Sequence, residues 1–217
     1  MRHNPDYELT ELAAVRALVR ENPWVTMVSH VPGAGLVASH CAVLLEEDAE
    51  GLVLLGHLGR PDERLHGLGR HEVMLIAYGP QGYVSPGWYR TAPAVPTWNF
   101  VAAHLHGTPE ILSDADNLEV LDRLVRRLEE PMPEPYLMGR TCENAEYAGR
   151  IAHGTVGFRV AVSRFEAKEK MSQDKPAEVV DRVIEALRRP GPYQNDALAH
   201  RMALVRDRRA RGLRGEA

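Results

Sequence analysis

Histidines at the ends and edges of apolar segments are the residues of this sequence best suited to chemistry. His104 and His106 stand two apart in an apolar run, so in a strand both imidazoles project from one face, roughly 6–7 Å apart. His57 follows the apolar run LVLLG and opens a turn, where an imidazole beside a glycine can reach a ligand. These three side chains are either ligands and proton carriers or ordinary core and strand-end histidines, and the spacing leaves both interpretations open.

Two further residues bear on the role of His57. Arg60, three positions on, carries a planar guanidinium that suits a phosphate or a propionate. His40, in ASHCAVLLE, is flanked by apolar positions and is the alternative to His57 as a metal ligand. The alternative for His57 and Arg60 is an ordinary strand-end histidine followed by a surface arginine.

Residues 76–107 concentrate aromatic, prolyl, glycyl and hydroxyl side chains between two apolar runs. Ordering such a loop costs much conformational entropy, so an ordered one is more often a site than a connector. Its polar, Pro and Gly content favours aromatic rings that face a cavity over rings that only fill a core. The residues expected to shape that pocket are Tyr83, Ser85, Trp88, Tyr89, Trp98 and Asn99.

A second polar segment, KEKMSQDK, precedes Pro176 at the start of an expected helix. Cations and hydroxyl groups at that position suit a carboxylate or a phosphate. A solvated run of charges is the alternative. The residues concerned are Lys168, Lys170, Ser172, Gln173, Asp174 and Lys175.

Composition limits the remaining possibilities. The 217 residues carry a net charge of -4 and only two cysteines, neither of them in a CxxC pair, so a disulfide framework and a thiolate zinc site are not expected. The acidic balance gives no general attraction to nucleic acid or to anionic membranes. No signal peptide and no apolar run long enough to span a membrane are present, which predicts a cytoplasmic protein.

The elements that must position these residues alternate between short strands and terminal helices. Periodicity predicts strands at 24–30, 36–45, 52–57, 72–78, 97–112 and 156–165, and helices at 10–20, 114–128, 145–152, 177–188 and 197–209. Thr10 is expected to cap the first helix. The helix 114–128 is expected to bury Leu118, Leu121, Leu124, Val125 and Leu128. This order predicts an α+β fold with an antiparallel sheet or barrel over 1–170 and a helical C-terminal extension over 171–217.

Five segments, in order, carry a resemblance to a known family: GHLGRP, GYVSPGWY, VPTWNFVAAHLHG, VGFRVAV and KEKMSQDKP. They resemble the PaiB-type proteins, often labelled FMN-binding negative transcriptional regulators, from about residue 24 to residue 202. The resemblance implies an FMN-binding-type split β-barrel, antiparallel, with peripheral helices. It also implies a homodimer with the cofactor at the subunit interface.

Departures from the family pattern point to one branch. The stretch GHLGRPDERLHG lacks the Asn-Pro pair of most members, and SQDKP followed by GPYQN and ALAHRM resembles the branch that contains piperazate synthase. That branch implies haem b (alternatively FMN) as cofactor and an amino-acid substrate. The reaction would close the N–N bond of L-piperazic acid from N5-hydroxy-L-ornithine with loss of water.

The resemblance implies roles for the candidate residues. The axial metal ligand would be His57, with His40 as the alternative. Residues expected to bind the cofactor are His57, Arg60, Trp88, Trp98, Lys168 and Lys170. Residues expected to bind the substrate are Ser85, Tyr89, Asn99, Ser172 and Gln173. Catalytic roles fall to His104, His106 and Tyr83.

Two other functions stay open on the same fold: a PaiB-type regulator that binds FMN or haem, and a flavin-dependent reductase. No helix-turn-helix pattern is evident, so operator binding would have to use the arginine-rich tail at 201–214 or a dimer groove. The sequence therefore favours a small-molecule partner over nucleic acid.

Overall fold

The computed structural model describes Met1 and residues 4–215. The chain divides into two compact units, each made of separate stretches of sequence. Unit 1 comprises Met1–Thr10, Tyr78–Ala103 and Glu166–Ala217, and unit 2 comprises Glu11–Ala77 and His104–Phe165. The division at residues 170 and 171 that the sequence predicts remains a prediction.

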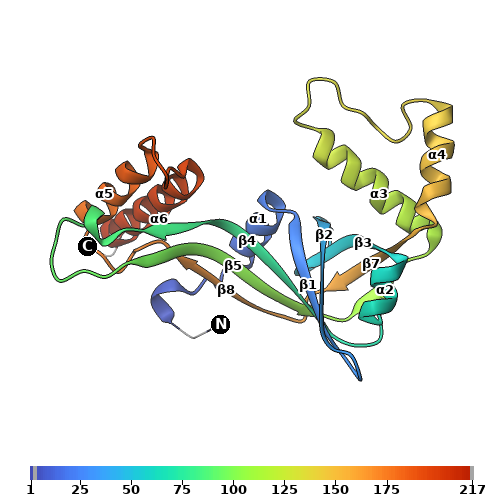
Figure 1. Cartoon of the computed structure of the whole chain (residues 1–217), viewed down its shortest axis with the longest axis horizontal. Helices are drawn as coiled ribbons and strands as arrows, with labels where there is room; N and C mark the ends of the chain where they lie inside the picture. Colours follow the sequence, from blue (N-terminus) through green and yellow to red (C-terminus); the bar gives the residue numbers. More distant parts are fainter. Residues whose placement is uncertain (2–3, 216–217) are drawn as a thin grey trace. The chain divides into compact units, whose positions relative to one another are not determined.

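Eight strands form one sheet in the order β6-β7-β3-β2-β1-β4-β5-β8. Their bounds are β1 Trp24–Val31, β2 Gly35–Leu45, β3 Val53–Gly59, β4 Val73–Val84, β5 Thr97–Gly107, β6 Pro109–Ile111, β7 Thr155–Ala161 and β8 Arg164–Lys170. Strand β1 pairs antiparallel with β2 and β4, and β7 pairs antiparallel with β3 and β6 (Figure 1). The predicted α+β fold with an antiparallel sheet is confirmed.

Strands β1 and β2 follow the alternation that a half-buried strand requires. Val25, Met27 and Ser29 are buried on β1, and the residues between them are not. The turn that joins the two strands contains Gly33, whose φ of 82° lies in the left-handed region that glycine adopts without strain. The predicted turn at Pro32-Gly33 is therefore confirmed.

The pairing of β3 with β7 depends on a glycine. Gly56 lies opposite Phe158, and a Cβ at Gly56 would meet Cζ of Phe158 at 2.6 Å. The missing side chain lets the Phe158 ring, which is fully buried, lie across β3. This contact fixes the register at which His57 is presented.

Helix α3 (Asp114–Glu129) covers one face of β3 and β7 in unit 2 (Figure 1). Val120 and Leu124 pack with Leu55 in a small core. The prediction of its inward face was wrong at both ends, because Leu118 is 37% exposed and Leu128 is 52% exposed. The buried stripe instead runs through Asn117, Val120 and Leu124, at the spacing of one helix face.

The other helices of unit 2 are α1 (Leu12–Glu21), α2 (Arg60–His66) and α4 (Cys142–Ala152). Thr10 does not cap α1, because the helix begins two residues later with Glu11 at the N-cap and no side-chain cap bond. The chain before it is extended in unit 1, where the N–H of Leu9 donates to the carbonyl of Ala167 at 3.0 Å. The backbone at Thr10 is thus not yet helical.

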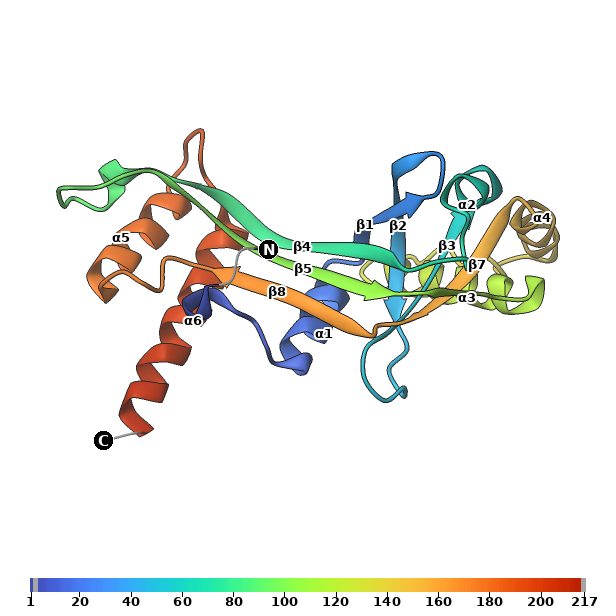
Figure 2. The same cartoon turned by 90° about the horizontal axis from the view of Figure 1, so that it is seen from below.

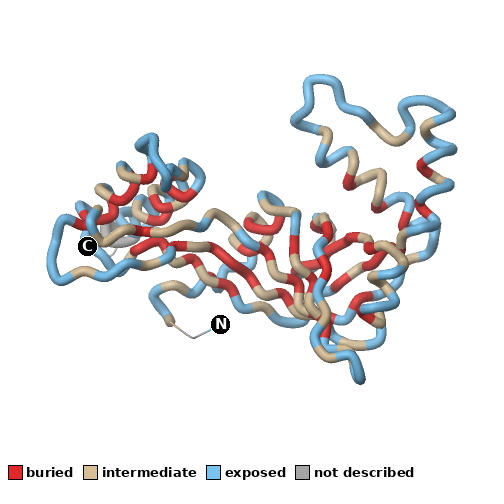
Figure 3. Tube along the Cα trace, in the orientation of Figure 1, coloured by how far each residue is buried: buried red, intermediate tan, exposed pale blue. Residues whose placement is uncertain are grey.

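Unit 1 holds two helices that pack side by side, α5 (Ala177–Arg188) and α6 (Asp196–Gly215) (Figures 1 and 2). Val183 and Leu187 of α5 and Leu198 and Met202 of α6 are buried. Figure 3 shows buried stretches along both helices. Asn195 caps α6, because its Oδ1 accepts the N–H of Leu198 at 3.0 Å. Both predicted C-terminal helices are present.

Two predicted strands proved to be four. The stretch 97–112 divides into β5 and β6 at Gly107, where a Cβ would meet the carbonyl oxygen of Ala161 at 2.5 Å. The stretch 156–165 ends as β7 at Ala161, and β8, rich in charged residues, follows. Sequence reasoning missed β8 because its buried positions are Ala167 and Glu169 rather than an apolar alternation.

Candidate functional site

His57 lies on β3 of unit 2, directly opposite Gly157 of β7. The residue is half-buried, and its Nδ1 is a buried atom with no hydrogen-bond partner among the residues that the structure describes. Burial lowers the pKa of this imidazole below its usual value, which favours the neutral ring. A neutral imidazole with an unused nitrogen is the form that binds a metal.

Arg60, at the start of α2, is tied to the protein itself. Its Nε donates to the carbonyl of His153 at 2.6 Å, and its Nη2 lies 3.5 Å from Oδ1 of Asp114. Its backbone N–H donates to the carbonyl of Gly154 at 3.0 Å. The guanidinium therefore anchors the end of α4, and its predicted role toward a cofactor stays a prediction.

The remaining predicted histidines of unit 2 have different surroundings. His40 is exposed, with Nδ1 3.0 Å from Oγ1 of Thr26 and its ring stacked on Trp24 at 6.4 Å. His104 and His106 are half-buried on β5, and Nδ1 of His106 lies 3.6 Å from Oε1 of Glu72. Among the described residues, the structure shows no hydrogen bond or ring contact that joins any of these three histidines to His57.

Aromatic residues of the predicted pocket come together in unit 1. The ring of Tyr83 lies 6.4 Å from Trp98 and 5.1 Å from Tyr193, and Tyr193 lies 6.3 Å from Trp88. The Nε1 of Trp98 donates to Oε1 of Gln81 at 3.0 Å. Tyr193, from the segment GPYQN, completes the cluster and was given no role by sequence reasoning.

Ser85 lies at the edge of this cluster. Its Oγ accepts the N–H of Gly87 at 3.2 Å and caps the short 3-10 helix Pro86–Trp88. The hydroxyl thus supports the local turn beside Trp88. Its predicted contact with a substrate stays a prediction.

Two predicted substrate residues meet in the interior of unit 1. Nδ2 of Asn99 donates to Oγ of Ser172 at 2.9 Å, and both side chains are buried. Ser172 has a φ of 60°, a left-handed conformation that is uncommon outside glycine. A buried polar pair at a strained backbone position is the pattern that functional sites often show.

A cavity of about 450 Å³ opens beside this pair in unit 1. It brings together the two segments singled out from the sequence, because Tyr89 and Thr97 come from one and Lys170 and Ser172 from the other. Its other lining residues are Tyr7, Thr91, Pro93, Ala94, Val95, Pro96, Asp174, Lys175, Pro176 and Val179. This volume lies within the usual range for small-molecule sites.

The cations of this cavity differ in their partners. Lys175 forms an ion pair with Asp174 at 2.7 Å, and that carboxylate raises the pKa of Lys175. Lys170 donates to Oγ1 of Thr97 and lies 6.0 Å from the ring centre of Tyr7. Burial lowers the pKa of Lys170. Lys170 is thus the cation that an incoming carboxylate would best satisfy.

The pKa values of two tyrosines and one aspartate around the cavity are also shifted. Burial raises the pKa of Tyr7 to about 12, and burial raises that of Tyr89 as well. Burial of Asp174 opposes its ionisation, but the hydrogen bond and charge of Lys175 outweigh it and lower the pKa. Both phenols therefore stay protonated, and the Tyr7 hydroxyl donates to the carboxylate of Asp174.

Two predicted residues of this region do not line the cavity. The Nε2 of Gln173 donates to the carbonyls of Glu169 at 2.6 Å and Asp6 at 3.0 Å, and its Oε1 accepts the N–H of Met171 at 2.6 Å. This amide holds the segment after β8. Lys168 is half-buried on β8. Their roles toward a ligand stay predictions.

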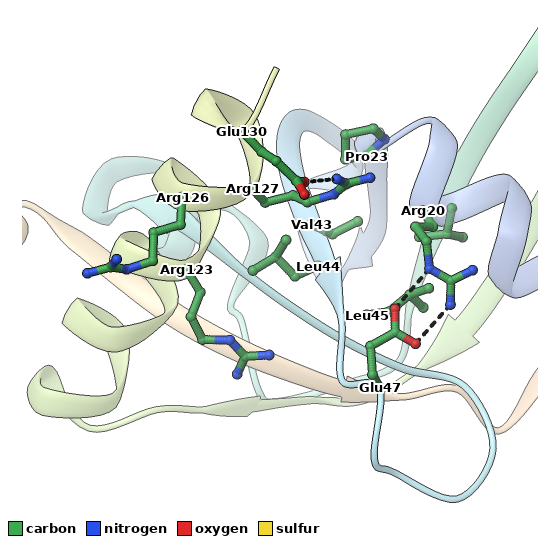
Figure 4. A pocket seen from close by; sticks show the side chains of 11 residues that line it. Arg20, Pro23, Val43, Leu44, Leu45, Glu47, Arg123, Arg126, Arg127 and Glu130 are labelled. Carbon is green, nitrogen blue, oxygen red and sulfur yellow. Dashed lines mark hydrogen bonds and ion pairs between the residues drawn. The ribbon is translucent and has the colours of Figure 1, made fainter. Parts of the chain in front are cut away.

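A second cavity of about 640 Å³ lies in unit 2, between the end of α1, β2 and α3 (Figure 4). Val43, Leu44 and Leu45 form an apolar side. Arg20 pairs with Glu47 at 2.8 Å, whereas Arg123 extends from α3 toward the β2 side. None of the residues singled out from the sequence lines this cavity.

Other site types are not found in the described part of the chain. No group of three or more His, Cys, Asp and Glu side chains there could hold a metal ion by itself. No helix of that part is both long and apolar enough to cross a membrane.

The chain matches the family model described as "Putative FMN-binding domain" over residues 1–164, and it belongs to this family. It is 26% identical over 183 residues to "Protease synthase and sporulation protein PAI 2" of Bacillus subtilis (strain 168), which covers 83% of this chain and 86% of the relative. The PaiB-type family inferred from the motifs is thereby confirmed.

Solved structures share the fold. The FAD and haem binding protein of Mycobacterium smegmatis has a TM-score of 0.56 and 17% identity, covering 80% of this chain and 78% of its own. The flavocytochrome Anf3 of Azotobacter vinelandii has a TM-score of 0.55 and 16% identity, covering 75% and 69%. These likenesses confirm the predicted fold, a split β-barrel of the FMN-binding type.

Proposed function

We propose that this protein is a haem-binding enzyme in which His57 would hold the haem iron, and that it closes an N–N bond in a hydroxylated amino acid. The observation that carries the cofactor assignment is the half-buried imidazole of His57: its Nδ1 is buried without a partner among the described residues, so Nε2 is the nitrogen that would meet a haem iron. Because burial lowers its pKa, the ring is neutral at physiological pH and has a lone pair to offer. These properties fit haem.

The fold gives this assignment a precedent. Two proteins with the same fold are, by their names, an FAD and haem binding protein and a flavocytochrome. The branch assignment rests on the motifs KEKMSQDKP and GPYQNDALAHRM, which resemble piperazate synthase. Haem b and N5-hydroxy-L-ornithine are accordingly the proposed cofactor and substrate.

The cavity of unit 1 supplies the features that a zwitterionic amino acid needs. Lys170 would hold the α-carboxylate by a charge-assisted hydrogen bond. The phenol of Tyr89, kept protonated by burial, would orient the ligand as a donor. Pro93, Pro96 and Val179 supply apolar walls that exclude water around the hydrocarbon chain.

The reaction forms one bond and breaks one. The α-nitrogen bonds to N5, the N5–O bond breaks, and the hydroxyl leaves as water with a proton from the amine. Bound haem iron would supply Lewis-acid or redox assistance to the departure of the hydroxyl oxygen. Holding the two nitrogens at near-attack distance favours closure of the six-membered ring. His104, His106 and Tyr83 remain the candidates for moving the proton.

A flavin-binding PaiB-type regulator is the second candidate. The family description and the likeness to the PAI 2 protein favour it, because both connect the chain to flavin binding or regulation. The cations Lys170 and Lys175 would then face the phosphate of FMN rather than a carboxylate. A flavin-dependent reductase would use the same residues.

The homodimer and the cytoplasmic location belong to this proposal. The apolar residues exposed on α3 and α4, Leu118, Leu128, Tyr147 and Ile151, offer a face for a second copy. An aqueous compartment that holds haem and a free amino acid suits the reaction.

An absorption spectrum of protein expressed with a haem precursor tests the cofactor. A Soret band is expected, and a yellow flavin spectrum would favour the second candidate. Mass spectrometry of N5-hydroxy-L-ornithine turnover tests the reaction: loss of 1 water per substrate is expected by the stoichiometry of ring closure. A haem-loaded protein that leaves the substrate unchanged would contradict the enzyme assignment.

A further inference from the structure

The register of β3 and β7 places a helix residue beside His57. His57 and Gly157 are directly opposed, and side chains of opposed residues project from the same face of a sheet. A Cβ at Gly157 would lie 3.0 Å from Cα, Cβ and Oδ1 of Asn117. Asn117 of α3 therefore occupies the space over Gly157, on the face that carries the imidazole.

The amide of Asn117 is held in one orientation. Its Nδ2 donates to Oγ1 of Thr155 at 3.0 Å and to the carbonyl of Ala152 at 3.4 Å. Thr155 is itself fixed, since its Oγ1 donates to the same carbonyl at 2.8 Å. These bonds turn Oδ1 toward Gly157. The acceptor thus faces the side of the sheet where His57 lies.

Two polar atoms on this face have no hydrogen-bond partner among the residues that the structure describes. Asn117 is 3% exposed, and its Oδ1, like Nδ1 of His57, is buried without a hydrogen bond among the described residues. A buried acceptor left unsatisfied is destabilising. An imidazole N–H is the donor that would satisfy it, and the broad terminal torsion of a histidine ring lets the ring turn toward a neighbouring acceptor.

We propose that Asn117 is a positioning residue for His57: its Oδ1 accepts the Nδ1–H of the imidazole, directly or through one bound water. This bond fixes the neutral ring in the Nδ1–H tautomer and leaves the lone pair on Nε2. Histidines that bind metals commonly donate their other N–H in this way, which orients the ring and strengthens the ligand. The consequence for haem rests on the proposed function, whereas the tautomer does not.

If Asn117 had a purely structural role, only the Nδ2 group of its amide would be needed. The Nδ2 bonds tie α3 to the start of β7 and explain why an asparagine is buried on a helix face. They do not explain why Oδ1 of Asn117 faces the imidazole side of the sheet without a donor among the described residues. Thr155→Val removes two structural bonds, from Nδ2 of Asn117 to Oγ1 of Thr155 and from that Oγ1 to the carbonyl of Ala152, and it keeps the acceptor Oδ1, so it is the matched control.

Imidazole ¹⁵N shifts of the cofactor-free protein test the tautomer, with His57→Gln identifying the signal. The Nδ1–H form is expected for the wild type, Thr155→Val and Asn117→Asp, which keeps an acceptor. Asn117→Leu is expected to lose that preference. A wild-type His57 in the Nε2–H form would overturn the proposal, and this result needs no variant to fold. An unchanged tautomer in a folded Asn117→Leu protein would also overturn it.

Haem titration then separates this proposal from the proposed function. Asn117→Leu is expected to weaken haem binding by about 10–100-fold relative to Thr155→Val, because an unsupported imidazole is a weaker ligand. Equal affinities would overturn the positioning role. If the wild type shows the Nδ1–H tautomer but takes up no haem, the cofactor assignment fails while the Asn117–His57 bond stands.

Discussion

Nδ2 of Asn99 donates to Oγ of Ser172 across 2.9 Å, although the two residues are 73 positions apart in the sequence. The bond joins β5 to the residues that follow β8. It brings the aromatic loop and the lysine-rich segment to one cavity of unit 1. Residues predicted separately to bind a substrate therefore share one site.

Lys170→Met should raise the KM for the amino-acid substrate by about 10–100-fold. A hydrogen bond to a charged group is worth about 1.5–3 kcal/mol, and Lys170 is the cation of the cavity without an ion-pair partner in the described structure. Steady-state kinetics on the haem-loaded enzyme measures the change. Arg164→Met, on the same strand but outside the cavity lining, is the control. Equal KM values for the two variants would refute the carboxylate role.

Glu169→Ala should lower the free energy of unfolding by about 3–5 kcal/mol, because it leaves the mostly buried charge of Arg201 unpaired. Glu169 is 6% exposed and bonds both Arg201 and Arg208 of α6. Arg208→Ala should cost far less, since that side chain is 48% exposed and Arg201 remains. Urea denaturation of both variants checks the difference. Similar losses would show that the ion pairs do not hold α6.

Gly56→Ala should destabilise unit 2 by about 1–3 kcal/mol through overpacking. The new Cβ would meet Cζ of Phe158 at 2.6 Å and the carbonyl oxygen of Ala42 at 3.1 Å. Gly59→Ala on the same strand is the control, because its nearest neighbour is 3.7 Å away. Thermal denaturation followed by circular dichroism compares them. A stable Gly56→Ala protein would contradict the register of β3 and β7.

The stability of unit 2 should fall in acid because of His66. This residue is fully buried, its Nδ1 lies 2.7 Å from Oγ of Ser29, and burial lowers its pKa, with Asp62 opposing and His71 adding to the shift. The unfolded chain takes up a proton near the usual value of 6.5, which the folded ring resists. The stability that comes from burying the neutral ring is therefore fully present above about pH 6.5, and it is lost as the pH falls toward the lowered pKa.

Urea denaturation near pH 8 and near pH 5.5 (about 2.5 units apart) measures this loss. His66→Gln should reduce the difference between the two conditions. Ser29→Ala, which leaves the imidazole buried, should preserve it. An equal difference in wild type and His66→Gln would assign the acid sensitivity to other groups.

Much of the fold followed from local patterns, because apolar alternation and turn residues report burial directly. Strands β1, β2 and β3 lie within two residues of their predicted bounds. Strand β8 was missed because its buried Glu169 is satisfied by Arg201 and Arg208, more than thirty residues away. No local pattern reveals such a partner.

The site was predicted unevenly for the same reason. Tyr89, Lys170 and Ser172 line the cavity, and each comes from a segment whose composition had indicated a site. Tyr7 and Tyr193 were missed, since single tyrosines carry no pattern of their own. Asn117 left one usable signal: it takes a position of the stripe shared with Val120 and Leu124, where an amide needs a specific partner.

Haem titration of His57→Ala, followed by the Soret band, tests the central claim most directly. His40→Ala is the matched control, because His40 is the exposed alternative ligand. The account predicts that His57→Ala loses more affinity than the about 10–100-fold expected for a supporting residue such as Asn117, while His40→Ala binds as the wild type does. An unchanged Soret band and affinity in His57→Ala would contradict the account.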